Sequence, residues 1–551
     1  MQVTQSYATP SHATSSTEGM QFNFSPELSR PPVRLDALIK NSLSYARIML
    51  ALRQVVIGDW RGKQKDHTAY QAWVTEQYLK ELPDHLKNMD AEKAKMLQER
   101  EKLTTLKKQI QKDIYPIQSA FTKARYKYYD WLYRNDRDKW MLLDPVIIVH
   151  QEAVIIEDYS QAESAYGRVS VASEQLETFG DVDYGTTNID FSMALANELY
   201  RVRSYRPAWL KVAFEQVALS TDIGASVEKK IDLPESWVRG FLQVQSASSL
   251  EGIDLTLHSQ TLSQVLSILE QRKEKVSPRS LRFQLATGQP VKIVIDPWEI
   301  TIEDTLTYTG DFEGEIRLWG RRRLSVLKEL LPYTDEVHVK LLGTGMPSYW
   351  SIFLEGHRFD IGLSGWTAND WAKKGNFDLL ASTEKTDEKT VEKVEKILIE
   401  RLALTPKEVA TTLQLSTAKA TTALQTLCQN GQAMYDHLSG QYRWRQLLKQ
   451  DITLTDTEED ERLGYALTLL KEKKVTIISQ SFSEEEQLTT YHAEVQGKNL
   501  FKPVIQLDTD GKVKRATCTC GFFRSNKLRK GPCMHLMATI MKIGQSSSLS
   551  S

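Results

Sequence analysis

Three of the four cysteines of this 551-residue chain lie close together near its C-terminal end. Cys518, Cys520 and Cys533 are followed by His535, which gives the pattern C-x-C-x12-C-x-H. Thiolate and imidazole groups are preferred zinc ligands, and four of them complete the tetrahedral shell of Zn²⁺. We therefore predict one structural zinc ion held by these four residues. A full protein shell leaves no open position for water or substrate, so we do not expect a catalytic metal.

The sequence around the ligands predicts how the chain brings them together. The sequence predicts a helix that begins near Cys533. We expect the last strand to bend or to end at the C-x-C pair, Cys518 and Cys520. Three strand-like runs precede the ligand loop, at 491–496, 501–507 and 512–519.

This arrangement resembles the SWIM zinc finger, in which C-x-C and C-x-H follow a β-hairpin and precede a short helix. The four ligand positions of that finger match Cys518, Cys520, Cys533 and His535. The sequence segments 185–192, 233–241 and 363–371 are also similar to segments of bacterial SWIM-containing proteins. Such proteins are often encoded beside a MoxR-type AAA+ ATPase and a von Willebrand factor A protein. The resemblance implies these two as partners and supplies no catalytic residues.

The charge of the chain is balanced, with 70 Lys and Arg against 71 Asp and Glu, so an electrostatic partner must be sought in local patches. Residues 491–551 hold ten basic and three acidic side chains. We expect this basic module to bind nucleic acid or a partner protein, and the acidic segment 451–490 is an internal candidate for the protein contact. The side chains predicted to make the contact are Arg524, Lys527, Arg529, Lys530, Lys512, Lys514, Phe522 and Phe523.

Phe522 and Phe523 have two interpretations. Either ring could stack on a nucleic-acid base. The alternative is that both fill the small zinc core while the lysines only keep the module soluble.

The length predicts three or four domains, and the patterns predict an α+β multidomain fold. Residues 1–32 and 545–551 have little to bury and are expected to be disordered tails. Residues 33–143 have a helical pattern, with an apolar residue at every seventh position from Met89 to Trp131. This stripe favours either intramolecular packing of a long helical region or a coiled coil with a partner.

Residues 145–375 are predicted to form a mainly antiparallel α+β domain because short alternating runs dominate its second half. Helices are expected at 192–204, 260–272 and 322–331. Arg321-Arg322-Arg323 opens the last of these, where positive charge is unfavourable for the helix dipole. A bound anion, an acidic partner or a solvated helix end would each accommodate these charges.

Residues 388–448 have the order of a winged-helix module, three helices followed by a hairpin. The third helix carries a single cation, Lys419, which favours a structural or protein-docking role over sequence-specific DNA binding. An acidic linker or helix is expected at 449–489, and the zinc finger at 490–544.

Several function classes lack their local signatures. The sequence has no G-x-x-x-x-G-K-[ST], H-E-x-x-H or G-x-S-x-G motif, and no apolar run of about 18 to 20 residues that would span a bilayer. No signal peptide is visible, so we predict a cytoplasmic, non-membrane protein. The favoured function is a non-catalytic zinc protein that binds nucleic acid or a partner protein, as an adaptor for an AAA+ ATPase system. The alternative is a nucleic-acid-processing enzyme that uses carboxylates dispersed over 145–370, with the finger as its targeting module.

Overall fold

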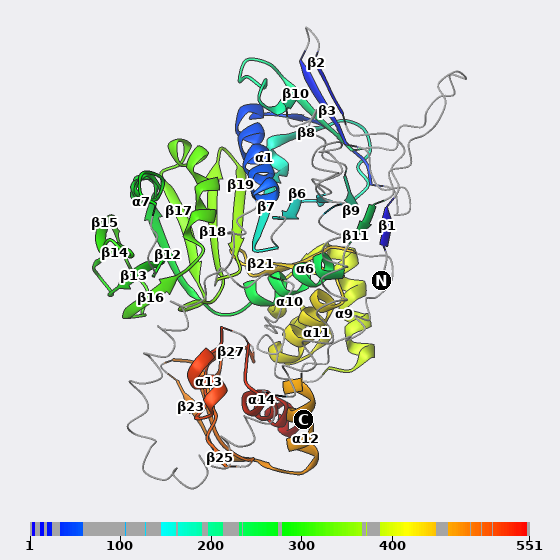
Figure 1. Ribbon diagram of the computed structural model, residues 1–551. Helices are drawn as coiled ribbons and strands as arrows, with labels where there is room; N and C mark the ends of the chain where they lie inside the picture. The colour runs from blue at the N-terminus through cyan, green and yellow to red at the C-terminus, as the bar shows by residue number, and fades with distance from the viewer. Residues whose placement is uncertain are drawn as a thin grey trace. The chain divides into compact units, whose positions relative to one another are not determined.

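The chain is a mixed α+β protein with several antiparallel sheets (Figure 1). The predicted apolar stripe from Met89 to Trp131 lies outside the described residues. The computed structural model describes residues 3–5, 12–15, 19–24, 33–58, 145–160, 163–189, 197–212, 231–233, 235–273, 278–365, 386–447, 461–484, 486–497, 499–509, 511–529 and 531–547, and the single positions 105, 127 and 371.

The largest sheet has eight antiparallel strands in the order β12-β17-β18-β19-β7-β6-β5-β9. Helix α1 (Ser42–Ile57) packs on its central strands. At Gly167 of β7 an added Cβ would lie 2.8 Å from the side chain of Leu52, so glycine permits this close approach. The strands are β5 Val146–Val149, β6 Ala153–Tyr159, β7 Ala165–Ala172, β9 Gly185–Asn188, β12 Ile253–His258, β17 Glu336–Leu341, β18 Ser348–Leu354 and β19 His357–Leu363.

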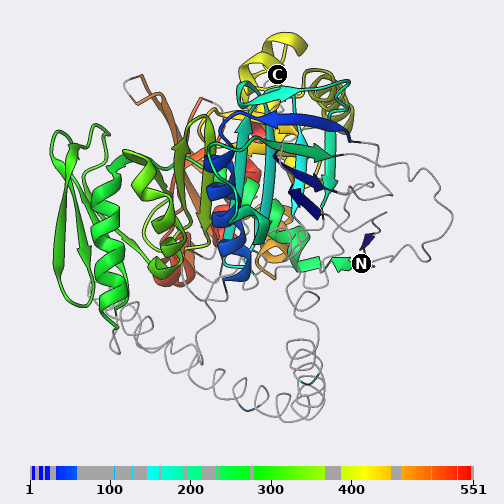
Figure 2. The ribbon, with the colours of Figure 1, turned by 90° about the horizontal axis from the view of Figure 1, so that it is seen from above.

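A second antiparallel sheet follows the order β15-β14-β13-β16, seen at the left of Figure 2. Its strands are β13 Leu281–Leu285, β14 Pro290–Ile295, β15 Ile300–Thr307 and β16 Gly314–Leu318. Helix α7 (Ser259–Gln271) confirms the helix predicted at 260–272. The segment predicted as a helix at 322–331 is instead a tighter 3₁₀ turn, Arg321–Glu329, followed by another at Leu331–Tyr333.

The N-terminal residues contribute strands where a disordered tail was expected. Strand β3 (Met20–Phe24) buries Met20, Phe22 and Phe24, because the sequence M-Q-F-N-F alternates apolar and polar residues. Strand β4 (Leu35–Ile39) begins the region predicted as helical. The sheet order is β2-β3-β10-β4-β8, with β2 His12–Ser15, β8 Leu176–Thr178 and β10 Ala208–Val212. A separate pair joins β1 (Val3–Gln5) to β11 (Ile231–Leu233), and helix α6 (Glu235–Ser248) follows.

Three helices and a small sheet occupy 388–444. The Thr405 side chain accepts a hydrogen bond from Glu408 N, and the Glu408 carboxylate accepts one from Thr405 N. The side chain of Ser416 caps the third helix. These residue types at these positions predict the starts of helices. The elements are α9 Glu388–Arg401, β20 Ala403–Leu404, α10 Pro406–Leu413, α11 Thr417–Gln429, β21 Ala433–Asp436 and β22 Gln441–Trp444.

The C-terminal module combines a sheet in the order β23-β24-β26-β27 with helices α12 and α14, which pack together. Helix α12 and strand β23 both fall in the segment 449–489, where an acidic linker or helix was predicted; the strand was not predicted. The elements are α12 Glu461–Lys471, β23 Val475–Ser483, β24 Leu488–Gln496, β25 Leu500–Phe501, β26 Val504–Leu507, β27 Val513–Thr517, α13 Gly521–Asn526 and α14 Met534–Ser547.

Candidate metal centre

The ligand atoms of Cys518, Cys520, Cys533 and His535 all lie within 4.8 Å of one another. The four residues are 6%, 3%, 0% and 3% exposed. Three sulfur atoms and one ring nitrogen at this spacing can coordinate one metal ion, and this donor set suits Zn²⁺. The structure therefore brings together the four residues that the sequence pattern singled out.

Each ligand is positioned by the end of a secondary-structure element. Strand β27 ends at Thr517, immediately before Cys518, so both cysteines of the C-x-C pair lie beyond the strand. Residues two apart in a strand point to the same face, so the spacing alone does not require this end. Cys520 is the N-cap of α13, and its sulfur accepts a hydrogen bond from Phe523 N at 3.4 Å. Cys533 directly precedes α14, and His535 lies in the first turn of that helix. The amide groups and dipole at the start of a helix favour a negatively charged thiolate.

The four ligand residues also contact one another. The Sγ atom of Cys518 lies 3.9 Å from Nδ1 of His535, so Nδ1 is the ring nitrogen that faces the sulfur atoms. Hydrogen bonds from the thiols of Cys518 and Cys533 hold the pKa of Cys520 well below its ordinary value. All three thiols must lose their protons to bind a metal.

A ring of the preceding strand orients the histidine. Phe501 of β25 stacks on His535, with ring centroids 4.1 Å apart and planes inclined by 26°. Buried Ile505, Leu536 and Ile540 belong to the same apolar cluster as the ligands, which keeps water away from the site. The sequence placed Phe501 in a strand, and no local motif marked its contact with the histidine.

The two phenylalanines of the ligand loop contribute to the apolar core. Phe523 is buried, and partly buried Phe522 packs against the same cluster. The guanidinium of Arg462 in α12 lies 5.0 Å from the ring centre of Phe522. These contacts favour the core-filling interpretation over stacking on a base.

The predicted binding cations have different environments. Arg529 is buried, and its guanidinium donates to Ser525 O at 2.6 Å. Lys514 pairs with Glu251 at 3.0 Å, and Lys512 lies over the ring of Tyr435 at 5.3 Å. Lys527 is exposed, Arg524 is half-buried, and Lys530 lies outside the described residues. Arg529 and Lys514 are thus already engaged within the chain.

Arg321 and Arg323 are buried, which corrects the expectation of a solvated helix end or a bound anion. The Nη1 atom of Arg321 donates to Ser280 O at 2.7 Å, and Arg323 donates to Ser164 O and to the Ser364 hydroxyl. Burial lowers the pKa of Arg323 to about 10. Carbonyl and hydroxyl oxygens of the chain therefore take the place of an anion.

No sequence motif predicted the buried polar cluster at β18, β19 and the β21–β22 hairpin. Arg168 pairs with Asp360 at 2.7 Å and with Asp436 at 3.4 Å. The Ser351 hydroxyl donates to Asp360 Oδ1 at 2.5 Å and lies 3.2 Å from Nε2 of His437. In a hydrolase triad the carboxylate bonds the imidazole. Here the carboxylate of Asp360 accepts from the serine and pairs with an arginine, so the hydrogen-bond order differs from that of a triad.

Comparison with known proteins does not assign the chain to a family. No protein-family model matches the sequence, and no curated protein matches it. Among solved structures, the proliferating cellular nuclear antigen of Entamoeba histolytica is 11% identical, with a TM-score of 0.28 over 40% of this chain and 89% of that one. The A. fulgidus PCNA bound to the C-terminal region of FEN-1 is 13% identical, also with a TM-score of 0.28, over 41% and 90%. A TM-score this low does not establish a shared fold.

None of the described helices combines the length and the apolar character needed to cross a membrane.

Proposed function

We propose that this chain is a non-catalytic binding protein whose C-terminal module is a SWIM-type zinc finger. The observation that carries the proposal is the convergence of three buried sulfur atoms and one histidine nitrogen within 4.8 Å. The order of elements, with strands ahead of the C-x-C pair and a helix after the C-x-H pair, supports the SWIM assignment.

The zinc ion has a structural role in this proposal. It would join the end of β27, the start of α13 and the start of α14. Zinc binding contributes about 10 to 16 kcal/mol of apparent folding free energy to small fingers, so the ion would determine whether the module folds.

A protein partner fits the surface of the module better than nucleic acid does. Phe523 and Arg529 are buried, and Lys514 is paired with Glu251, so these side chains are not free to bind bases or phosphates. The family resemblance makes an AAA+ ATPase and its von Willebrand factor A companion the partner classes to test first. We place the α9–β22 segment in the same role, as a winged-helix-like docking module.

The competing function is a nucleic-acid-processing enzyme with dispersed carboxylates. Among the described residues, the Cys and His cluster is the group of potential metal ligands that converges, and carboxylates form no such group. The buried carboxylates Glu157, Asp360 and Asp436 each pair with an arginine. Such pairing favours structural roles for them.

Two measurements test the proposal. Elemental analysis of the reduced, full-length protein should find one zinc per chain, and Cys533→Ser should lose it. Cys428→Ala is the matched control, since Cys428 is buried in the separate core of the α9–β22 segment and should leave the zinc in place. A full-length protein without zinc contradicts the proposal.

The second measurement separates the two functions. Purified protein is incubated with single- and double-stranded DNA and RNA, with Mg²⁺ and without it. We expect no cleavage, and binding that is weak and disappears as salt rises. Mg²⁺-dependent turnover would favour the enzyme.

A further inference from the structure

Strand β23 (Val475–Ser483) ends the sheet of the C-terminal module. It is nine residues long, eight of which pair with β24, and no described strand pairs with its other edge. An edge strand directs alternate N–H and C=O groups away from its sheet, where they can pair with another chain.

The sequence of β23, VTIISQSFS, carries no charge and no proline. Natural proteins usually protect a long edge strand with lysine, proline or a covering segment. Here Ile478 is 57% exposed and Phe482 is 55% exposed. The one protective feature is a register shift with β24 between Ile477 and Ser479. The composition of β23 is therefore that of an edge strand that can pair with a strand of another chain.

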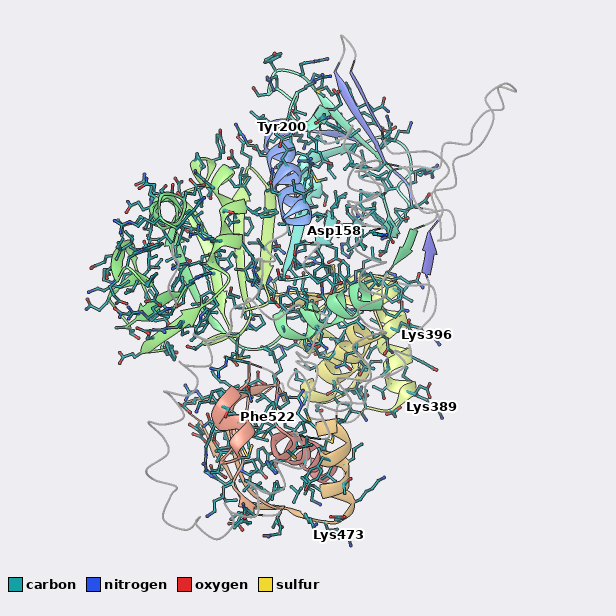
Figure 3. All side chains as sticks on the ribbon, viewed as in Figure 1. Asp158, Tyr200, Lys389, Lys396, Lys473 and Phe522 are labelled. Atoms are coloured by element: carbon teal, nitrogen blue, oxygen red, sulfur yellow. The ribbon has the colours of Figure 1, made fainter. Side chains whose placement is uncertain are left out.

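Opposite charges border this uncharged strand. Lys473 and Lys474 precede it and are exposed, and Lys474 also pairs with Glu472 at 2.6 Å. Figure 3 places Lys473 at the surface of the module. Glu484 and Glu486, within a run of three glutamates, follow it and are also exposed. In an antiparallel pairing of two identical strands, the start of one lies beside the end of the other, so the basic end meets the acidic end.

We propose that a second copy of this chain docks on β23 as an antiparallel strand, which gives a two-fold symmetric dimer with a continuous sheet. Full overlap of the nine residues centres the pairing on Ser479. Lys474 of each copy then lies opposite Glu484 of the other, and Ile478 lies diagonally across from Phe482 of the second copy. Two salt bridges and two apolar contacts are formed by symmetry.

The test uses charge exchange in the full-length protein. Lys474→Glu and Glu484→Lys each place like charges opposite one another twice in the dimer. Each variant alone should raise the dimer Kd about tenfold, because like charges directly opposite across a strand pair are destabilising. An equimolar mixture of the two variants should recover the dimer, since both cross-strand pairs in the heterodimer are again opposite in sign. Sedimentation over a concentration series measures each Kd.

Two further variants complete the test. Ile478→Lys with Phe482→Lys should abolish the dimer while leaving the melting temperature nearly unchanged, because both side chains are exposed. Arg515→Glu, an equal charge change on exposed β27 at the opposite end of the sheet, should leave the Kd unchanged. A wild-type chain that stays monomeric, or a mixture that fails to restore the dimer, overturns the proposal. Zinc content should be equal in all variants, so this outcome is independent of the zinc finger.

Discussion

Arg445 and Glu157 form a fully buried ion pair: Nη1 of Arg445 lies 2.6 Å from Oε1 of Glu157, and neither side chain is exposed. The hydroxyl of Tyr166 donates to the other carboxylate oxygen at 2.5 Å. The pair joins the residue that follows β22 to the middle of β6, although 288 positions separate the two in sequence. It therefore fixes the β21–β22 hairpin on the eight-stranded sheet.

Removal of one partner of this pair should be costly. Arg445→Met leaves the Glu157 carboxylate buried without its cation, and we expect a loss of about 3 to 5 kcal/mol in the free energy of unfolding. The double variant Glu157→Gln/Arg445→Met should recover much of this loss, since neither position then carries a buried charge and the amide still accepts from Tyr166. Urea titration measures both. The control is Lys292→Met, which removes an exposed pair with Glu303 and should change stability by less than about 1 kcal/mol. Equal losses in the single and double variants would contradict the explanation.

His437 should make the protein less stable in acid. Burial lowers its pKa to about 4, from an ordinary value of 6.5. The folded state thus binds the proton more weakly than the unfolded state, and this contribution to stability is complete above pH 6.5 and is lost as the pH falls toward 4. The full shift corresponds to about 3 kcal/mol, and we expect about 2 because the ring keeps some contact with solvent.

Urea titrations between pH 7 and pH 4 measure this effect. His437→Gln should flatten the dependence in that window, whereas His492→Gln, at an exposed position of β24, should leave it unchanged. A steep dependence that persists in His437→Gln would assign the effect to other groups. The pKa of Asp436 is also lowered, chiefly by Arg168, against the effect of burial, so a further loss is expected at more acid pH.

The candidate metal site could be predicted from sequence because its ligands are rare residue types at short spacing. Cys518 and Cys533 could be assigned to one site because both are thiols that bind the same kind of metal. The structure places all four ligand atoms together. Helices with explicit start signals were predicted for the same reason: Thr405 with Glu408 is a local capping pattern, and the helix begins there. Short-range chemistry is visible in sequence.

Long-range pairing left no such signal. The sequence around Glu157 does not indicate that Arg445 is its ion-pair partner. The sequence around Arg321 likewise does not indicate that this side chain donates to the carbonyl of Ser280. Strand β23 was missed because most of its residues are exposed, so its sequence lacks the alternation that identifies a half-buried strand. The core-filling role of Phe523 depends on the fold around it and was one of two interpretations.

Metal removal should unfold the C-terminal module and leave the remainder of the chain folded. The ligands join β27, α13 and α14, and the loss of zinc leaves three thiols and an imidazole buried without a cation. We expect a strong chelator to expose the segment after residue 490 to limited proteolysis, with cleavage blocked again by added Zn²⁺. The α9–β22 segment has its own core and should stay resistant. Unchanged cleavage after complete zinc removal would contradict the structural role.

Gly365 should not tolerate a side chain. Its φ is +86°, and an added Cβ would lie 2.6 Å from the carbonyl oxygens of Gly345 and Met346. Gly288 is a matched control because its φ is +76° and no atom lies within 4 Å of the added Cβ. Gly288→Ala should cost about 1 kcal/mol from backbone strain. Gly365→Ala should cost clearly more, since backbone atoms must also move. Thermal unfolding compares the two, and equal losses would show that the close contact relaxes freely.

Phe501 should tune metal affinity without being a ligand. Its ring stacks on His535 at 4.1 Å and limits the rotation of the imidazole, which keeps Nδ1 directed at the sulfur atoms. Changes in the groups that orient metal ligands typically cost 10- to 100-fold in affinity, and we expect about tenfold for Phe501→Ala because stacking is weaker than a hydrogen bond. Competition with a chromophoric chelator measures the affinity. Phe482→Ala, a change of the same size at an exposed position of β23, should leave it unchanged. Phe501→Leu should retain part of the affinity if packing on the ring is the cause, and the same loss in both Phe501 variants would instead require aromatic stacking itself.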